Sequence, residues 1–349
     1  MVSIFGGITM HMADVLISPA VGGIAWAAGV GAVAYSAAKI KNELGEKKIP
    51  LMAVAGAFVF AAQMINFTIP ATGSSGHIGG GILLAGLLGP YPALLTIAAV
   101  LTIQCLFFAD GGLLALGCNI LNMGVIPALL VYPLIFKPIL KRGLSLKRLS
   151  LASFISVVVG LELGALGVVL ETLASGISAL PFGTFVLLML PIHLAIGIGE
   201  GIVTAGVLGF VYTQRPEIIE SSGEGTALAP GVSLRKVLGV LALITVLVGG
   251  GLSMFASAYP DGLEWAMEKT ITRSGSQPEA EGPLFRRAAA IQEAAAIMPD
   301  YDYRNAGEEG SATGTTVAGI AGSLFTCILA GAAGFIIYRV KRIQRHRAA

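Results

Sequence analysis

Two short stretches contain residue types that could bind a transition metal. Residues 10–12 (Met-His-Met) place a histidine directly after a methionine, and residues 73–77 (Gly-Ser-Ser-Gly-His) place another in a glycine-rich segment. If Met10 carried a free amine, that amine, the deprotonated His11 amide and His11 Nδ1 could chelate one ion, with His77 in a fourth position. Four nitrogens in a plane suit Ni(II) or Cu(II) and can accept Co(II), whereas zinc prefers a tetrahedron.

Further polar residues in neighbouring segments could hold these ligands in place. The candidates are Gln63, Asn66, Ser74, Ser75, Gln104, Asn119 and Asn122. Partners that orient metal ligands are a regular part of metal sites, but single buried amides also commonly bond helices to one another. Both roles stay open for these residues. Because the ligands must lose protons, metal binding is expected to weaken as the pH falls.

The remaining histidines are less specific. His193 and Glu200 are seven residues apart in an apolar segment and so share a helical face, and Glu162 and Glu171 lie in the segment before it. Ionisable groups within membrane segments are functional candidates, although packing or helix-bonding roles are favoured for these four. His346 lies in a basic tail and is expected to be solvated.

The composition indicates a membrane environment. Apolar residues make up 55% of the chain and charged residues only 12%, with a mean hydropathy of +0.83. Soluble domains contain about 25% charged residues. The net charge of +2 gives no indication of a nucleic-acid partner.

Stretches of about 20 apolar residues recur along the chain, and each could cross a hydrocarbon core as a helix. We therefore predict an all-α, polytopic membrane protein: a seven-segment helical bundle followed by a two-helix hairpin. The predicted segments lie near residues 18–38, 50–68, 77–89, 90–109, 111–136, 150–176, 183–212, 236–258 and 315–338.

The basic residues predict the orientation of these segments. Most of the 22 Lys and Arg residues follow the first, fifth, seventh and last segments, and so occupy alternate connections. The positive-inside rule places these connections in the cytoplasm. We therefore expect a multi-pass protein of the plasma (inner) membrane, with the N-terminus outside, the C-terminus inside, and both His11 and His77 near the outer face.

The segment at 77–89 is short. As a helix it would span only about 20 Å of a hydrocarbon core of about 30 Å. If it did not cross, every later basic connection would move outside. We therefore expect it to cross, after a non-helical stretch over residues 70–76 that must be covered by protein or line a water-filled cavity.

Two polar regions divide the rest of the chain. Residues 214–234 are rich in Gly, Ser and Pro and are predicted to form a cytoplasmic linker. Residues 259–314 form a predicted external loop in which acidic residues outnumber basic ones. This loop could gather cations and assist metal loading, or it could simply be solvated. Within it, the pattern LFRRAAAIQEAAAIM predicts a short amphipathic helix.

Several motifs resemble one known family. MHMADVLISP, ATGSSGHIGGG and FFADGGLLALGCNILNMG are similar to the CbiM/NikM family, the substrate-binding membrane subunits of energy-coupling-factor transporters for cobalt and nickel. This resemblance covers about residues 10–212. The Pro-Asp-Gly-Leu-Glu motif at 260–264 resembles the small NikN/CbiN-type partner, fused here to the same chain.

The resemblance implies that the metal is bound by the Met10 amine, the His11 amide, the His11 ring and His77. It also implies a transmembrane coupling (T) protein and a pair of cytoplasmic ATPases as partners. The family begins at this Met-His, whereas nine residues precede it here. An upstream peptide bond would remove the amine, so residues 1–9 are expected to be non-native or removed. The resulting domains are 10–213 and 235–349.

We thus predict a substrate-capture component of an ATP-driven Ni(II) or Co(II) importer, and not an enzyme. The sequence contains no Gly-x-x-x-x-Gly-Lys-Ser/Thr phosphate loop, so ATP hydrolysis is expected on other subunits. The ion is cargo, and no catalytic cofactor is expected. One alternative is an ion-gradient-driven secondary transporter that uses the intramembrane histidine and glutamates named above. An intramembrane metalloenzyme is disfavoured, because no His-Glu-x-x-His is present and a planar site leaves little room for hydrolysis.

Overall fold

The computed structural model describes residues 11–40, 44–177, 180–275, 282–305 and 311–348. Within these residues the chain is helical except for connecting segments and one two-stranded hairpin. The α-helices are α1 (Pro19–Lys39), α2 (Lys48–Gln63), α3 (Gly81–Leu88), α4 (Pro90–Phe108), α5 (Leu116–Ile120), α6 (Lys137–Lys141), α7 (Leu146–Ser175), α8 (Phe182–Gln214), α9 (Pro216–Glu224), α10 (Arg235–Gly250), α11 (Gly262–Ser274), α12 (Pro283–Ala295) and α13 (Ala312–Ala348). The other elements are η1 (Asp14–Leu16), η2 (Leu121–Phe136), η3 (Leu252–Phe255), η4 (Pro299–Tyr301), β1 (Phe67–Ile69) and β2 (Ser74–Gly76).

The predicted all-α, polytopic membrane fold is confirmed. Six helices in the described part of the chain are long and apolar enough to cross a membrane, and one of them is the continuous helix Leu116–Lys141 formed by α5, η2 and α6. Large apolar side chains such as Leu187 and Ile24 are more than two-thirds exposed on the outer surface of the bundle. Such a surface suits contact with lipid rather than with water.

Three predicted segments form helices shorter than a membrane span. Helix α2 has 16 residues and ends at Gln63, α3 has only eight, and α10 has 16. The largest difference from the prediction lies between α2 and α3, where residues 65–80 are non-helical and not only residues 70–76. There β1 and β2 pair antiparallel, with Thr68 opposite Ser75. Residues 74–76 and 78–80 are buried, whereas Thr68, Pro70, Ala71 and Gly73 are exposed, so protein covers only the second half of this stretch.

Helices α7 and α8 pack along each other over most of their length, and α7 also packs against η2. Helix α4 is largely buried at the centre of the bundle. The last helices do not stand apart from it, because α10 and α13 both pack on α2, and α13 also contacts α4. The C-terminal hairpin is therefore integrated into the bundle.

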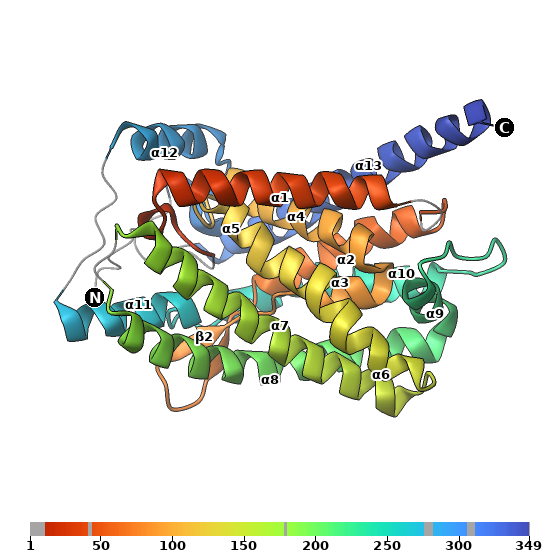
Figure 1. The fold of residues 1–349 in the computed structure, drawn as a ribbon, viewed down its shortest axis with the longest axis horizontal. Helices are drawn as coiled ribbons and strands as arrows, with labels where there is room; N and C mark the ends of the chain where they lie inside the picture. Colours follow the sequence, from red (N-terminus) through yellow and green to blue (C-terminus); the bar gives the residue numbers. More distant parts are fainter. Residues whose placement is uncertain (1–10, 41–43, 178–179, 276–281, 306–310, 349) are drawn as a thin grey trace.

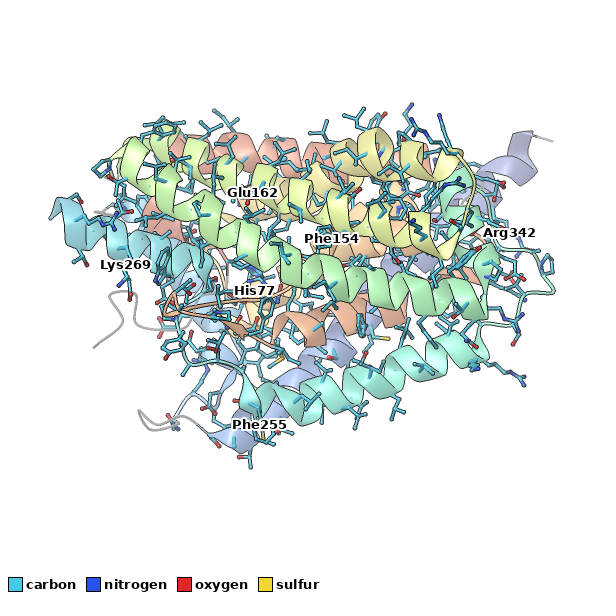
Figure 2. All side chains as sticks on the ribbon, turned by 90° about the horizontal axis from the view of Figure 1, so that it is seen from below. His77, Phe154, Glu162, Phe255, Lys269 and Arg342 are labelled. Carbon is cyan, nitrogen blue, oxygen red and sulfur yellow. The ribbon has the colours of Figure 1, made fainter. Side chains whose placement is uncertain are left out.

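The two ends of the bundle differ. Helices α11 and α12 and strand β2 lie at one end, whereas α6, α9 and the C-terminus lie at the other (Figure 1). Lys269 and Arg342 mark these opposite ends, and His77 lies inside the molecule between them (Figure 2). The basic connections after α1, around α6 and at the C-terminus share one end, as the alternating basic loops predict.

The region from 214 to 234, predicted as a linker, contains helix α9. Ile218 and Ile219 of this helix are buried, and Ser222 Oγ donates a hydrogen bond to the Gly86 carbonyl at 2.6 Å. Helix α9 thus packs against the short helix α3. The amphipathic helix predicted in the 259–314 loop is present as α12.

Candidate metal centre

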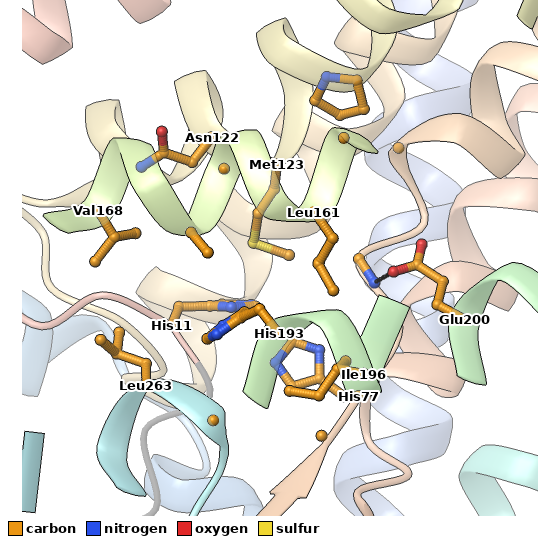
Figure 3. A pocket seen from close by; sticks show the side chains of 18 of the residues that line it. His11, His77, Asn122, Met123, Leu161, Val168, His193, Ile196, Glu200 and Leu263 are labelled. Carbon is orange, nitrogen blue, oxygen red and sulfur yellow. Dashed lines mark hydrogen bonds between the residues drawn. The ribbon is translucent and has the colours of Figure 1, made fainter. Parts of the chain in front are cut away.

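A cavity of about 100 Å³ lies among the β-hairpin, η2, α7, α8 and the start of α11. The rings of His11, His77 and His193 gather around it (Figure 3). The polar side chains that line it are those of His11, His77, Asn119, Asn122, His193, Glu200 and Asp261. The cavity therefore combines nitrogen donors with carboxylates in an otherwise apolar interior.

The segment that carries His11 is fixed through its backbone. Met12 N–H donates to Asn119 Oδ1 at 3.2 Å, and the Met12 carbonyl accepts from Asn119 Nδ2 at 3.3 Å and from Gly112 N–H at 2.9 Å. Gly111 has a φ of +76°, and a Cβ there would lie 2.8 Å from His11 Cβ. The glycines after Asp110 therefore allow this turn to wrap closely around the His11 segment.

The His11 ring is held in one orientation. Its Nε2 lies 2.9 Å from Gln104 Oε1 and 3.7 Å from Asp110 Oδ2. An amide oxygen can only accept, so the ring proton is on Nε2 and the lone pair is on Nδ1. That Nδ1 is buried and has no hydrogen-bond partner within the described residues. Orientation of a histidine through its second nitrogen is the usual arrangement around metal-binding histidines.

His77 is held in a similar way by the loop after β2. Its Nδ1–H donates to the Ile78 carbonyl at 3.0 Å, which leaves the ring lone pair on Nε2. The His11 and His77 ring centroids are 5.4 Å apart, with an interplanar angle of 76°. Since metal–nitrogen bonds are about 2 Å long, two rings at this separation are close enough to share one ion.

Glu200 anchors the loop that follows His77. Its two carboxylate oxygens accept from the N–H groups of Gly79 and Gly80, each at 2.9 Å. Figure 3 shows one of these bonds as a dashed line at Glu200. The Gly79 carbonyl accepts from Gln63 Nε2 at 3.0 Å. Gly80 has a φ of +79°, and a Cβ there would lie 2.5 Å from Val59, so this turn requires glycine. These contacts fix the backbone within three residues of the His77 ring.

Two further residues reach the cavity from α8 and α11. His193 Nδ1–H donates to the Met189 carbonyl at 2.8 Å, so its lone pair is on Nε2. Asp261 begins α11 and accepts from Glu264 N–H at 2.8 Å. Burial raises the pKa of Asp261 to about 7, although this hydrogen bond and the nearby His11 act in the opposite direction. A Cβ on Gly262 would lie 3.1 Å from His193 Cε1, so the start of α11 lies directly against this ring.

The residues predicted to support the site divide into two groups. Gln104 contacts the His11 ring, Asn119 clamps Met12, and Gln63 contacts the loop after His77. The others make different contacts. Ser74 and Ser75 bond to the backbone of residues 259–260, the Asn66 carbonyl accepts from Ser257 N–H, and Asn122 donates to Glu171 at 2.7 Å. Met10 and the side chain of His346 lie outside the described residues.

Three residues at or next to the cavity were not predicted from the sequence: Asp261 lines the cavity, Asp110 lies beside His11, and Tyr301 bonds to Asp110. Asp110 lies in the FFADGG stretch and Asp261 in the PDGLE motif. Each aspartate precedes a glycine within a family motif, and this context could have identified it as a candidate. Tyr301 has no such signal, because its partner is 191 residues away. Among the described residues, no three His, Cys, Asp or Glu side chains are grouped closely enough to hold a metal.

The fold and the cavity define a polytopic helical membrane protein with buried, oriented histidines near one end of the bundle. Residues 11–218 match the model for the CbiM family, described as the cobalt uptake substrate-specific transmembrane region, and residues 235–339 match the PDGLE domain. The chain belongs to the CbiM family, and its C-terminal part is a PDGLE hairpin.

Known relatives share this organisation. A putative fused nickel transport protein NikMN from Archaeoglobus fulgidus is 31% identical over 337 residues, which covers 95% of this chain and 99% of the relative. A fused nickel transport protein NikMN from Rhodobacter capsulatus is 30% identical over 84% of this chain and 88% of the relative. The crystal structure of a truncated transition metal transporter is similar with a TM-score of 0.52 at 31% identity, over 59% of this chain and 99% of that one.

Proposed function

We propose that this chain is the substrate-capture subunit of an ATP-driven importer of Ni(II) or Co(II). Family membership and the fused nickel-transport relatives support transport of one of these metals. The observation that carries the proposal is the His11 ring: its Nδ1 is buried with no hydrogen-bond partner in the described part of the chain, and its centroid lies 5.4 Å from that of the His77 ring. Leaving such a nitrogen unpaired is costly unless a ligand occupies it.

The proposed ligands are the Met10 amine, the His11 amide nitrogen, His11 Nδ1 and His77. This set needs Met10 as the first residue of the mature chain. Gln104, Asn119 and Gln63 are proposed to orient the ligands through the contacts described above. Nickel and cobalt accept the same nitrogen ligands, so the ligand set does not distinguish between the two ions.

The proposed partners are a membrane coupling protein and a pair of cytoplasmic ATPases. Capture takes place at the outer face of the plasma membrane, with the N-terminus outside and the C-terminus in the cytoplasm. The gathering of basic connections at one end of the bundle supports this orientation. In this arrangement, ATP hydrolysis on the partners drives release of the ion inward.

We expect accumulation of nickel or cobalt by cells that produce the complete transporter to stop when the phosphate-loop lysine of the ATPase partners is replaced. The measurement is uptake of the radioactive ion, with cells that lack this chain as the background. Uptake that survives loss of ATP hydrolysis would contradict the proposal and favour a gradient-driven transporter. The contacts of Glu200 argue against that alternative, because its carboxylate is already occupied by two backbone N–H groups.

A further inference from the structure

Tyr301 belongs to the loop between α10 and α13 but is buried against the end of α4. Its ring stacks on Phe108, with centroids 4.9 Å apart and an interplanar angle of 11°. Its hydroxyl donates a hydrogen bond to Asp110 Oδ2 at 2.5 Å. Burial and the neighbouring Asp110 charge raise the pKa of Tyr301 well above its usual range. At neutral pH the hydroxyl is therefore a hydrogen-bond donor.

The same oxygen of Asp110 lies beside the His11 ring, next to the nitrogen opposite the proposed ligand atom. Asp110 is only 1% exposed, and its Oδ2 lies 3.7 Å from His11 Nε2. The other oxygen beside this nitrogen is Gln104 Oε1, at 2.9 Å. The two oxygens favour a proton on Nε2 and so keep the lone pair on Nδ1, the proposed ligand atom.

The segment around Tyr301 is fixed to the turn that carries Asp110. The Ile297 and Met298 N–H groups donate to the Phe107 carbonyl at 2.9 and 3.1 Å. Gln292 Nε2 donates to the Gly111 carbonyl at 2.6 Å. Residues 292–301 therefore hold the turn on both sides of Asp110. Displacement of this segment would change the position of the carboxylate.

We propose that Tyr301 is a positioning residue for the metal site, holding Asp110 against the His11 ring. The PDGLE hairpin thereby completes a site whose ligands all come from the other part of the chain. This inference rests on the proposed role of His11 as a metal ligand. It adds a specific connection between the two fused parts, from the Tyr301 hydroxyl through Asp110 to His11 Nε2.

The test compares the mature chain that begins at Met10 with its Tyr301→Phe, Asp110→Asn and double variants. Tyr301→Phe keeps the ring on Phe108 and removes only the hydroxyl. Competitive titration with Ni(II) should show about 10- to 100-fold weaker binding in each single variant, the range for loss of a partner that orients a metal ligand. The double variant should bind about as weakly as Asp110→Asn alone, because the two residues act in series.

The ligand-field absorption of bound Ni(II) supplies a readout that a general loss of stability would not move. It should shift in both single variants as the His11 ring changes orientation. Tyr303→Phe is the matched control, since Tyr303 is 46% exposed, and it should match the unsubstituted chain in affinity and spectrum.

Unchanged affinity and absorption in Tyr301→Phe would overturn the inference, as would additive losses in the double variant. If Tyr301→Phe does not fold, Asp110→Asn alone decides the matter, with unchanged binding and spectrum counting against it. Failure of the unsubstituted chain to bind either Ni(II) or Co(II) would instead overturn the proposed function.

Discussion

Replacing either His11 or His77 by alanine is expected to abolish stoichiometric metal binding, whereas His346→Ala should leave it unchanged. Loss of the His11 ring removes one of the proposed chelate rings, and loss of His77 leaves a planar ion one nitrogen short. His346 lies in the basic tail at the end of the sequence and serves as the matched control. The measurement is metal content per chain after exhaustive dialysis of each purified variant.

His193→Ala belongs in the same series, because His193 lines the same cavity and also has its lone pair on Nε2. The four-nitrogen site does not include His193, so metal binding is expected to persist in His193→Ala and to be lost in His11→Ala and His77→Ala. If stoichiometric binding instead persists in His77→Ala and is lost in His193→Ala, His193 and not His77 is the fourth ligand.

Glu200→Gln is expected to weaken metal binding by roughly 10- to 100-fold. The carboxylate accepts from the N–H groups of Gly79 and Gly80, and glutamine can replace only one of these acceptors. The NH2 of the glutamine would then face the second backbone N–H, and this buried donor would lose its hydrogen bond. Loss of a hydrogen bond to a charged group costs about 1.5–3 kcal/mol. The loop would relax, and His77 would move with it. The measurement is Ni(II) affinity by competitive titration.

Glu162→Gln is the control for that experiment, since Glu162 lies on α7 outside the set of residues that line the cavity. It should bind Ni(II) as the unsubstituted chain does. Equal affinity in Glu200→Gln and the unsubstituted chain would show that the hydrogen bonds from Gly79 and Gly80 to Glu200 do not set the position of His77.

The long helices could be predicted from the sequence because continuous apolar stretches have a clear physical meaning in a membrane. The helix boundaries around the site could not be predicted in this way. Hydropathy continues past Gln63, whereas the backbone there turns into the β1–β2 hairpin and an extended loop. That turn depends on contacts with distant groups, such as the bond from Ser75 N–H to the Pro260 carbonyl at 2.8 Å.

The site itself was predictable to the extent that its chemistry is local. His11 and His77 stand out because each occurs in a short, unusual context, and the structure places their rings together. The roles of Asn66 and Asn122 could not be read from spacing, since each bonds to a partner that only the fold brings near. The same holds for Tyr301, whose segment reads as an acidic, polar loop and nevertheless packs on Phe108.

The most direct test of the four-nitrogen site is the intact mass and metal content of the protein purified from its native membrane. The proposed ligand set requires a free amine on Met10, because an upstream peptide bond would replace that amine by an amide and remove one of the four ligands. We predict a chain that begins at Met10 and holds one nickel or cobalt ion. A chain that begins at Met1 and still holds one ion tightly would contradict the proposed ligand set.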